Sequence, residues 1–320
     1  MTPKTKTRLA LFAGLLASGL AFAGSAAAAG WVERPFNPPV GSRWIIQEDY
    51  AEEDDDNGTI AKSAKKVTSE LTIEAKTADG FRISYVRRAS SFEGDPEEAA
   101  QSRAALAALQ GIRYVVVTDA AGKPLRVENL SEAIAARKKM VDALAATATD
   151  PRVAAAVTSV FADFANLDPA SAAASALDEL PTLAIGQNTG LKIGEARRVA
   201  STPQVGPGFE IAKTTTLSIA SADEATGEVH LTLTEVSDPE SMRAMLVGMY
   251  SRMRPSDPAG ADAAIALVKR MTISQENRTD FDVVDGMTRR METLSTTSRT
   301  LANTRRVVTS RTVVTVSPPP

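Results

Sequence analysis

The chain has 320 residues, of which 36 are Lys or Arg and 39 are Asp or Glu, so its formal net charge at pH 7 is −3. It contains no cysteine and one histidine, His230. Without cysteine, disulfides, thiolate zinc sites, thiol nucleophiles and iron–sulfur clusters are excluded. A single histidine excludes metal motifs that need two. The slightly acidic balance argues against a dedicated nucleic-acid-binding protein, which needs a concentrated basic surface.

Residues 1–29 have the three parts of an export signal. Three basic residues precede an apolar run over residues 9–23, and A-x-A sequences end at Ala23 and at Ala29. This order is typical of a secretory signal peptide, so we expect cleavage after Ala23 or Ala29. A membrane anchor is the alternative, but the run is shorter than the ~20 residues that a spanning helix needs.

Cleavage of the signal peptide would change the net charge of the chain, and the signal itself indicates the compartment. The removed segment carries three basic residues and no acidic one, so the net charge of the mature chain becomes −6. We expect a soluble bacterial protein that is periplasmic or secreted and does not span the membrane after processing. In that oxidising compartment a chain without cysteine is stabilised by its core alone. The mature length suffices for one large domain or two smaller ones.

Hairpin patterns occur in both halves of the mature chain. Apolar and polar residues alternate over residues 67–76 and 81–87, and again over 214–220 and 228–236, with a glycine-containing turn inside each pair. Period-two alternation on both sides of such a turn predicts a half-buried β-hairpin. We expect Gly80 and Gly227 to supply the permissive backbone that reverses the chain.

A second hairpin follows in each half, after a helical insertion. The insertions cover residues 96–110 and 239–271, and the second contains two helical pieces separated by prolines. The predicted strands of these hairpins are residues 111–118, 123–129, 271–284 and 287–298. The shared order of hairpin, helix and hairpin indicates a duplicated unit.

These elements predict the domain organisation. Residues 30–130 form a first β-rich half, residues 131–181 a helical connector and residues 182–320 a second β-rich half. Asn129, three residues before Glu132, resembles a capping box at the start of the connector. Near the C-terminus, residues 305–317 read as a strand that prolines end. We expect an α+β fold with one or more curved antiparallel sheets, with Ala-rich helices packed on or between the halves.

His230 is the first candidate for chemistry. The alternation of its strand points Leu231 and Leu233 inward and His230 outward, with Thr232. No G-x-S-x-G nucleophile motif accompanies it, so we interpret it as a surface residue rather than a general base or triad member. We predict no catalytic residue, no cofactor and no metal ligand.

The acidic run over residues 52–57, followed by Gly58, invites a calcium-loop interpretation. If Gly58 took the sixth loop position, the twelfth would fall on Ala64, where an EF-hand needs a bidentate Glu. We therefore favour a solvated hairpin tip, because Asn57-Gly58 is a preferred two-residue turn. Four Arg-Arg pairs are dispersed along the chain and are interpreted as solvated strand faces: Arg87-Arg88, Arg197-Arg198, Arg289-Arg290 and Arg305-Arg306.

Two motifs carry a resemblance to known families. The sequence VGSRW ends at Trp44, 36 residues before Gly80, and a D-x-x-G-K turn runs from Asp119 to Lys123. Leu191 stands at the corresponding position, 36 residues before Gly227. This arrangement resembles uncharacterised exported bacterial families with duplicated half-barrel units. The layout is also similar to LolA-type lipoprotein carriers, which implies a curved sheet, covered by helices, that holds lipid.

Two functions from different classes remain. The first is a non-catalytic envelope protein that binds or carries an apolar small molecule or lipid between its sheet and its helices. The alternative is a structural or interaction protein that presents an exposed sheet edge, or the C-terminal strand, to an envelope protein partner by β-augmentation. An enzyme is a third choice, because nucleophile, metal and acid–base signatures are missing.

Overall fold

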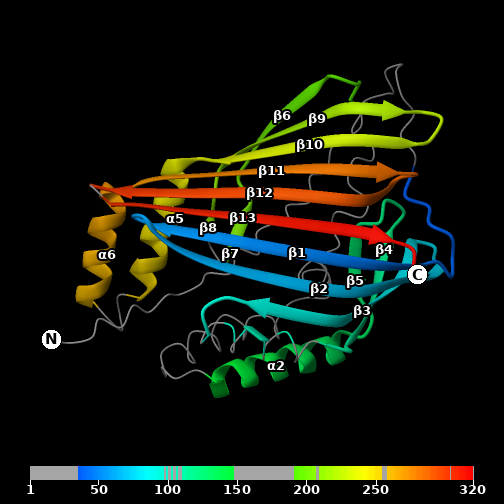
Figure 1. The fold of residues 1–320 in the computed structure, drawn as a ribbon, viewed down its shortest axis with the longest axis horizontal. Coiled ribbons are helices and arrows are strands. Elements are labelled where there is room, and N and C mark those ends of the chain that lie inside the picture. The colour runs from blue at the N-terminus through cyan, green and yellow to red at the C-terminus, as the bar shows by residue number, and fades with distance from the viewer. Residues whose placement is uncertain are drawn as a thin grey trace.

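A long antiparallel sheet dominates the computed structural model, which describes residues 35–96, 99, 102–103, 106, 110–147, 191–206, 209–253, 258–302 and 304–319. The sheet has 11 strands in the order β5-β4-β3-β2-β1-β13-β12-β11-β10-β9-β6 and is open, ending at β5 and β6 (Figure 1). The predicted signal peptide and most of the predicted connector lie outside the described residues. The described chain is mostly β, and the α+β expectation holds in this coarse sense.

The first half contributes strands on one side of the sheet and one long helix. Its elements are β1 (Arg43–Asp56), β2 (Thr59–Lys76), β3 (Gly80–Glu93), β4 (Arg113–Asp119), β5 (Pro124–Val127) and α2 (Leu130–Thr147). Asn57 and Gly58 both have positive φ, 58° and 88°, and form the predicted tight turn between β1 and β2. The hairpin-tip interpretation of the acidic run is confirmed.

Gly80 reverses the chain for a different reason from Gly227. Gly227 has a φ of 69°, the left-handed region in which glycine is favoured, as predicted. Gly80 is instead needed for close approach, because a Cβ there would lie 2.1 Å from the carbonyl carbon of Asp119. Gly80 and Asp119 are direct partners across β3 and β4, and a side chain at residue 80 would push these strands apart.

The predicted capping box at α2 takes another form. The Oδ1 of Asn129 accepts from the backbone N–H of Val115 in β4 at 2.8 Å, not from the first turn of its own helix. The Asn129 side-chain amide donates to the Glu132 carboxylate at 2.9 Å. Asn129 therefore joins the helix to the sheet, which a local motif in the sequence does not reveal.

The second half contributes the other side of the sheet and a helical pair. Its elements are β6 (Ala196–Ser201), β7 (Gln204–Gly206), β8 (Phe209–Glu210), β9 (Lys213–Asp223), β10 (Glu228–Ser237), α5 (Pro239–Met253), α6 (Pro258–Arg270), β11 (Thr272–Val284), β12 (Met287–Leu301) and β13 (Thr304–Ser317). The predicted hairpins and both helical pieces are present here. Strands β6 to β8 were not expected. Near Leu191, the position that corresponds to Trp44, the described chain makes one isolated bridge, from Ile193 to Ile219.

The two halves form one sheet because β1 pairs with β13. The antiparallel register runs from Ile45 opposite Ser317 to Asp56 opposite Arg306. β13 also pairs with β12 along its length, so both edges of its backbone are occupied. The suggestion that the C-terminal strand offers itself to a partner by β-augmentation is therefore wrong. Whether the halves arose by duplication stays a prediction.

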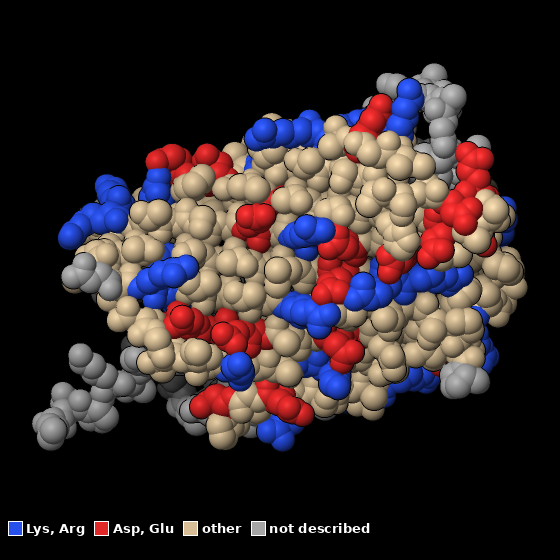
Figure 2. Space-filling view, turned by 45° about the horizontal axis from the view of Figure 1, so that its top comes forward, with Lys and Arg blue, Asp and Glu red and all other residues tan. Residues whose placement is uncertain are grey.

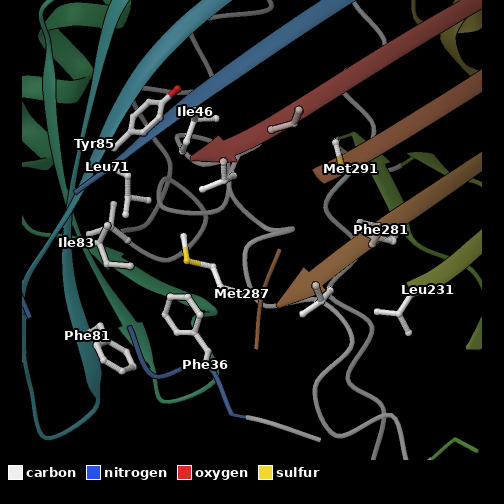
Figure 3. Packing of buried hydrophobic residues seen from close by; sticks show 14 of the residues in the cluster. Phe36, Ile46, Leu71, Phe81, Ile83, Tyr85, Leu231, Phe281, Met287 and Met291 are labelled. Carbon is white, nitrogen blue, oxygen red and sulfur yellow. The ribbon is translucent and has the colours of Figure 1, made fainter. Parts of the chain in front are cut away.

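One hydrophobic core joins the halves. Ile83 of β3, Leu231 of β10 and Ala133 of α2 belong to the same buried cluster, which requires the sheet to curve around it. Figure 3 shows side chains of the two halves facing each other, with Phe36 and Met287 between them. A second cluster packs α5 and α6 against β11, through residues that include Met242, Leu246, Val268 and Ile273.

Candidate binding face of the sheet

Alternation along the strands gives the sheet two chemically distinct faces. On β1, Ile46, Glu48 and Tyr50 point toward the core, and we call this the inner face. Gln47 and Asp49 point away and are exposed, which defines the outer face. Because paired residues of neighbouring strands lie on the same face, the strand register extends these assignments across the sheet.

The outer face is covered by ion pairs. Figure 2 shows basic and acidic side chains interspersed over it. Glu292 of β12 accepts from Arg311 of β13 at 2.7 Å and also from Arg290, and these hydrogen bonds hold the pKa of its carboxyl below the ordinary value. Asp280 accepts from Arg278 and, at 2.6 Å, from the hydroxyl of Thr232. This face has the composition of a solvated surface.

His230 lies on this outer face, as predicted. Its side chain is 45% exposed, and Nδ1 lies 2.7 Å from Asp282 of the neighbouring strand. Glu228 lies 3.8 Å from Nε2. The carboxylate Asp282 orients the ring, but no serine or threonine hydroxyl is within hydrogen-bond reach of Nε2 among the described contacts. The arrangement is a cross-strand pair.

The inner face begins with a broad apolar zone. We use "apolar zone" for the inner-face residues Leu71, Ile73, Val67, Ile83, Ile46, Val316, Val314, Met291, Phe281, Val283, Leu231, Val229 and Ile219, which are all buried. One row of direct cross-strand partners runs through it from Val314 and Met291 to Phe281 and Leu231. Figure 3 shows several of these side chains converging. The sequence alternation predicted this part of the face.

Four residues farther along these strands, the inner face carries a row of polar side chains, and beyond that row Ile273 of β11 belongs to the second buried cluster. We use "polar row" for the direct cross-strand partners Ser63, Glu52, Ser310, Ser295, Asn277, Glu235 and Thr215, which belong in turn to β2, β1, β13, β12, β11, β10 and β9. None of them is classed as exposed; Glu235 and Thr215 are buried and the others half-buried. A polar row of this length on the inner face was not predicted, because serine and threonine in one strand do not reveal their neighbours in the next.

The charged groups around the polar row pair with one another. Lys65 Nζ lies 2.5 Å from Glu48, and Lys213 contacts Glu235, which also accepts from Thr215 at 3.3 Å. Between the two zones, the hydroxyls of Thr279 and Thr293 are 3.0 Å apart. Asn277 Oδ1 is a buried acceptor for which the described residues provide no hydrogen-bond partner. Buried polar atoms are usually satisfied, so Asn277 marks a position where a ligand or a water is expected.

The other end of the apolar zone carries an arginine. Arg289 of β12 stacks over the Trp44 ring of β1, with its guanidinium carbon 4.1 Å from the ring centroid. It is half-buried, and burial lowers the pKa of its guanidinium. Arg290, the next residue, points to the outer face and pairs with Glu292. The interpretation of this Arg-Arg pair as a solvated face is therefore right for Arg290 and wrong for Arg289, because consecutive residues of a strand lie on opposite faces.

The acidic run does not form a convergent carboxylate site. Glu52 and Asp54 lie on the inner face, whereas Glu53 and Asp55 lie on the outer face. Asp54 binds Arg306 through both oxygens, at 2.6 and 2.8 Å, and Asp55 accepts from the turn N–H of Gly58 at 2.7 Å. In the described part of the chain, no group of three or more acidic or histidine side chains is placed to hold a metal ion.

A shallow cavity of about 420 Å³ lies at the β6 edge. Ser201, Thr202, Lys213, Ser237 and Asp238 are among the residues that line it. It also has apolar lining residues, among them Ala200, Ala212 and Val236, and it lies at one border of the sheet, away from the apolar zone. Of the helices that the structure describes, none is long and apolar enough to cross a membrane.

No protein-family model matches the chain, and neither does any curated protein. Among solved structures the chain is similar to lipovitellin, described in a study of its lipid–protein interactions, with 7% identity and a TM-score of 0.42. That match covers 88% of this chain but only 26% of the lipovitellin chain.

Two further structures are more distant. An outer-membrane channel from Pseudomonas putida F1 matches at 9% identity and a TM-score of 0.17, over 92% of this chain and 100% of the channel. The translocator domain of the autotransporter NalP from Neisseria meningitidis matches at 6% identity and a TM-score of 0.18, over 88% and 90% of the two chains. At these scores the likenesses carry no conclusion about function, which therefore depends on the residues of the inner face.

Proposed function

We propose that this chain is a binding protein that holds an amphiphile of the lipid class on the inner face of its sheet. The observation that supports this proposal is the change, along the same face and in the same strands, from an apolar zone to a polar row. Buried polar groups cost free energy unless they are hydrogen-bonded, and Asn277 in this row has a buried oxygen without a hydrogen-bond partner among the described residues.

The apolar zone has dimensions that suit acyl chains. From Ile73 to Val67 on β2 it extends six residues, which at the rise of a β-strand is about 20 Å. Each leaflet of a bilayer has a hydrocarbon layer of about 15 Å, half of the bilayer core. On α2, the small side chain of Ala133 is buried in the same cluster as this zone. Binding pockets for small molecules have this mostly apolar lining with a few placed polar groups.

Native mass spectrometry of the full chain, purified without detergent from its bacterial host, tests the proposal. We expect adducts in the mass range of lipids, which organic extraction removes. An adduct-free mass after gentle purification, together with no uptake of a fluorescent phospholipid analogue by the extracted protein, would contradict the proposal.

A matched pair of substitutions on β12 separates binding from folding. Met291 points into the apolar zone, whereas Leu294 lies on the outer face and is 45% exposed. We expect Met291→Gln to weaken uptake of the analogue at least tenfold, since a buried polar amide without a partner costs about 1–3 kcal/mol. Leu294→Gln should bind like the wild type. Circular dichroism at the assay temperature checks that both variants are folded.

We further infer that the protein acts outside the cytoplasm. The support is the signal-peptide pattern of residues 1–29. Expression in a bacterial host, followed by fractionation and N-terminal sequencing, tests this inference. A mature chain that begins at Gly24 or Gly30 in the periplasm or the medium is expected. An intact N-terminus in the cytoplasm would overturn it.

A further inference from the structure

Arg289 differs in its partners from Lys65, Lys213 and Arg306 of the inner face. Lys65 pairs with Glu48, Lys213 with Glu235 and Arg306 with Asp54. Among the described residues, Arg289 has no carboxylate within salt-bridge distance; the charge of Asp285, which opposes the lowering of its pKa, acts from farther away. Its contacts are the Trp44 ring at 4.1 Å and the sulfur of Met287 at 3.6 Å, a weak acceptor.

This arrangement leaves most of the hydrogen-bonding capacity of Arg289 unused. A guanidinium has five N–H donors in a planar fork that matches the oxygens of a phosphate or a carboxylate. Holding such a group half-buried without an anion is costly. The lowered pKa of Arg289 is the electrostatic sign of that cost, because burial disfavours the charged form. An anion bound to the guanidinium would offset this cost.

The position of Arg289 also favours a ligand that is partly apolar. Arg289 borders the apolar zone at the end opposite the polar row, between Met287 and Met291 on β12, which are both buried in the main cluster. The Trp44 ring covers one face of the guanidinium. The N–H donors lie in the plane of the guanidinium, so this stacking leaves its edge available for hydrogen bonds. If the anionic group of an amphiphile bound here, the apolar chains of that amphiphile would lie over the apolar zone.

We infer that Arg289, oriented by Trp44, binds the anionic phosphate or carboxylate group of the amphiphile whose chains occupy the apolar zone. This inference rests on the proposed function and assigns the headgroup end of that site. The polar row at the other end is not the anion site, because its charged members, Glu52 and Glu235, are carboxylates that repel an anion.

Binding of three lipids with identical acyl chains tests the inference. The probes are phosphatidylglycerol, which is anionic, phosphatidylcholine, which is zwitterionic, and diacylglycerol, which has no phosphate. Each is titrated into the extracted full chain. The wild type should bind phosphatidylglycerol about tenfold or more tightly than diacylglycerol, as expected for charge-assisted hydrogen bonds.

The neighbouring residue Arg290 provides the matched control for substitutions of Arg289. Arg289→Gln should remove the preference for phosphatidylglycerol and leave diacylglycerol binding within about twofold, whereas Arg290→Gln, with the same change of charge on the outer face, should keep the preference. Arg289→Lys should keep part of it, since Lys retains the charge but not the fork. Trp44→Leu should weaken the preference while the arginine remains.

The outcomes separate the two proposals. If no lipid binds to the folded wild type, the proposed function fails. If all three bind equally, or if Arg289→Gln keeps the preference, the assignment of Arg289 fails and the lipid site stands. Inorganic phosphate is added as a competitor: displacement of phosphatidylglycerol binding to the diacylglycerol level supports an anion site at Arg289. Binding of inorganic phosphate that is lost in Arg289→Gln, without any lipid binding, would show a free phosphate as the ligand and overturn the headgroup assignment.

Discussion

The apolar zone and the polar row are built on the same strands and the same register, and they differ only in side chains. In the apolar zone, inner positions such as Leu71 and Phe281 are fully buried and pack across the two halves. In the polar row, Ser63 and Asn277 occupy equivalent inner positions and are half-buried. The comparison teaches that backbone pairing holds the whole sheet together, while side-chain burial is divided into two clusters with the polar row between them.

The largest expected effect on stability distinguishes the apolar zone from the polar row on the same strand, β2. Leu71→Ala should lower the free energy of unfolding by about 3 kcal/mol, because a fully buried leucine is replaced by a cavity. Ser63→Ala, eight residues earlier on β2, should change it by less than about 0.5 kcal/mol. Urea denaturation of the full chain measures both values. Equal losses would mean that the polar row is packed like a core.

The next effect concerns the buried pair beside the polar row. The side chains of Lys213 and Glu235 are 12% and 8% exposed. Glu235→Leu alone should cost about 3 kcal/mol, because it leaves a buried ammonium group without its carboxylate. The double variant Lys213→Met/Glu235→Leu should recover most of that loss. A thermal-denaturation double-mutant cycle measures the coupling, and additive losses would show that the two groups do not interact.

A smaller, pH-dependent effect on the free energy of unfolding comes from Glu74 on the outer face. Burial opposes ionisation of Glu74, but hydrogen bonds from Arg113 and Ser84 and the charges of Arg113 and Arg82 outweigh it, so the pKa of Glu74 lies below its ordinary value of 4.5. A lowered folded-state pKa stabilises the protein above the unfolded-state pKa, and this contribution is lost as the pH falls through the folded-state pKa.

The variant Glu74→Gln should therefore be less stable than the wild type at pH 7, and the difference should shrink once the pH falls below 4.5. Denaturant unfolding of both proteins across the acid range measures this. A difference that stays constant with pH would show that ionisation of Glu74 makes no contribution.

The smallest expected effect is at His230. Because its contacts are exposed cross-strand pairs, His230→Gln should change the free energy of unfolding by less than about 0.5 kcal/mol and leave lipid binding unchanged. A loss of binding would contradict the assignment of this residue to the solvated face.

The sequence predicted the local elements well and their assembly poorly. Alternation located the β2–β3, β9–β10 and β11–β12 hairpins, and the outward position of His230 followed from the same pattern. The polar row escaped prediction because it needs the register of several strands, and register depends on pairing between residues far apart in the chain. Arg289 was hidden for a simpler reason, since its pairing with Arg290 suggested one solvated patch although a strand divides such a pair between two faces.

The β1–β13 ladder has a consequence for how the molecule is made. Asp54 and Arg306, which bind each other across it, are separated by 252 positions in sequence. Contacts between residues so far apart in sequence form slowly, because a long loop must close before the contacts can stabilise the fold. The central ladder therefore cannot be completed until the end of the chain has been synthesised, and until then two incomplete sheets expose long unpaired edges. Such a nascent chain would depend on chaperones to avoid aggregation.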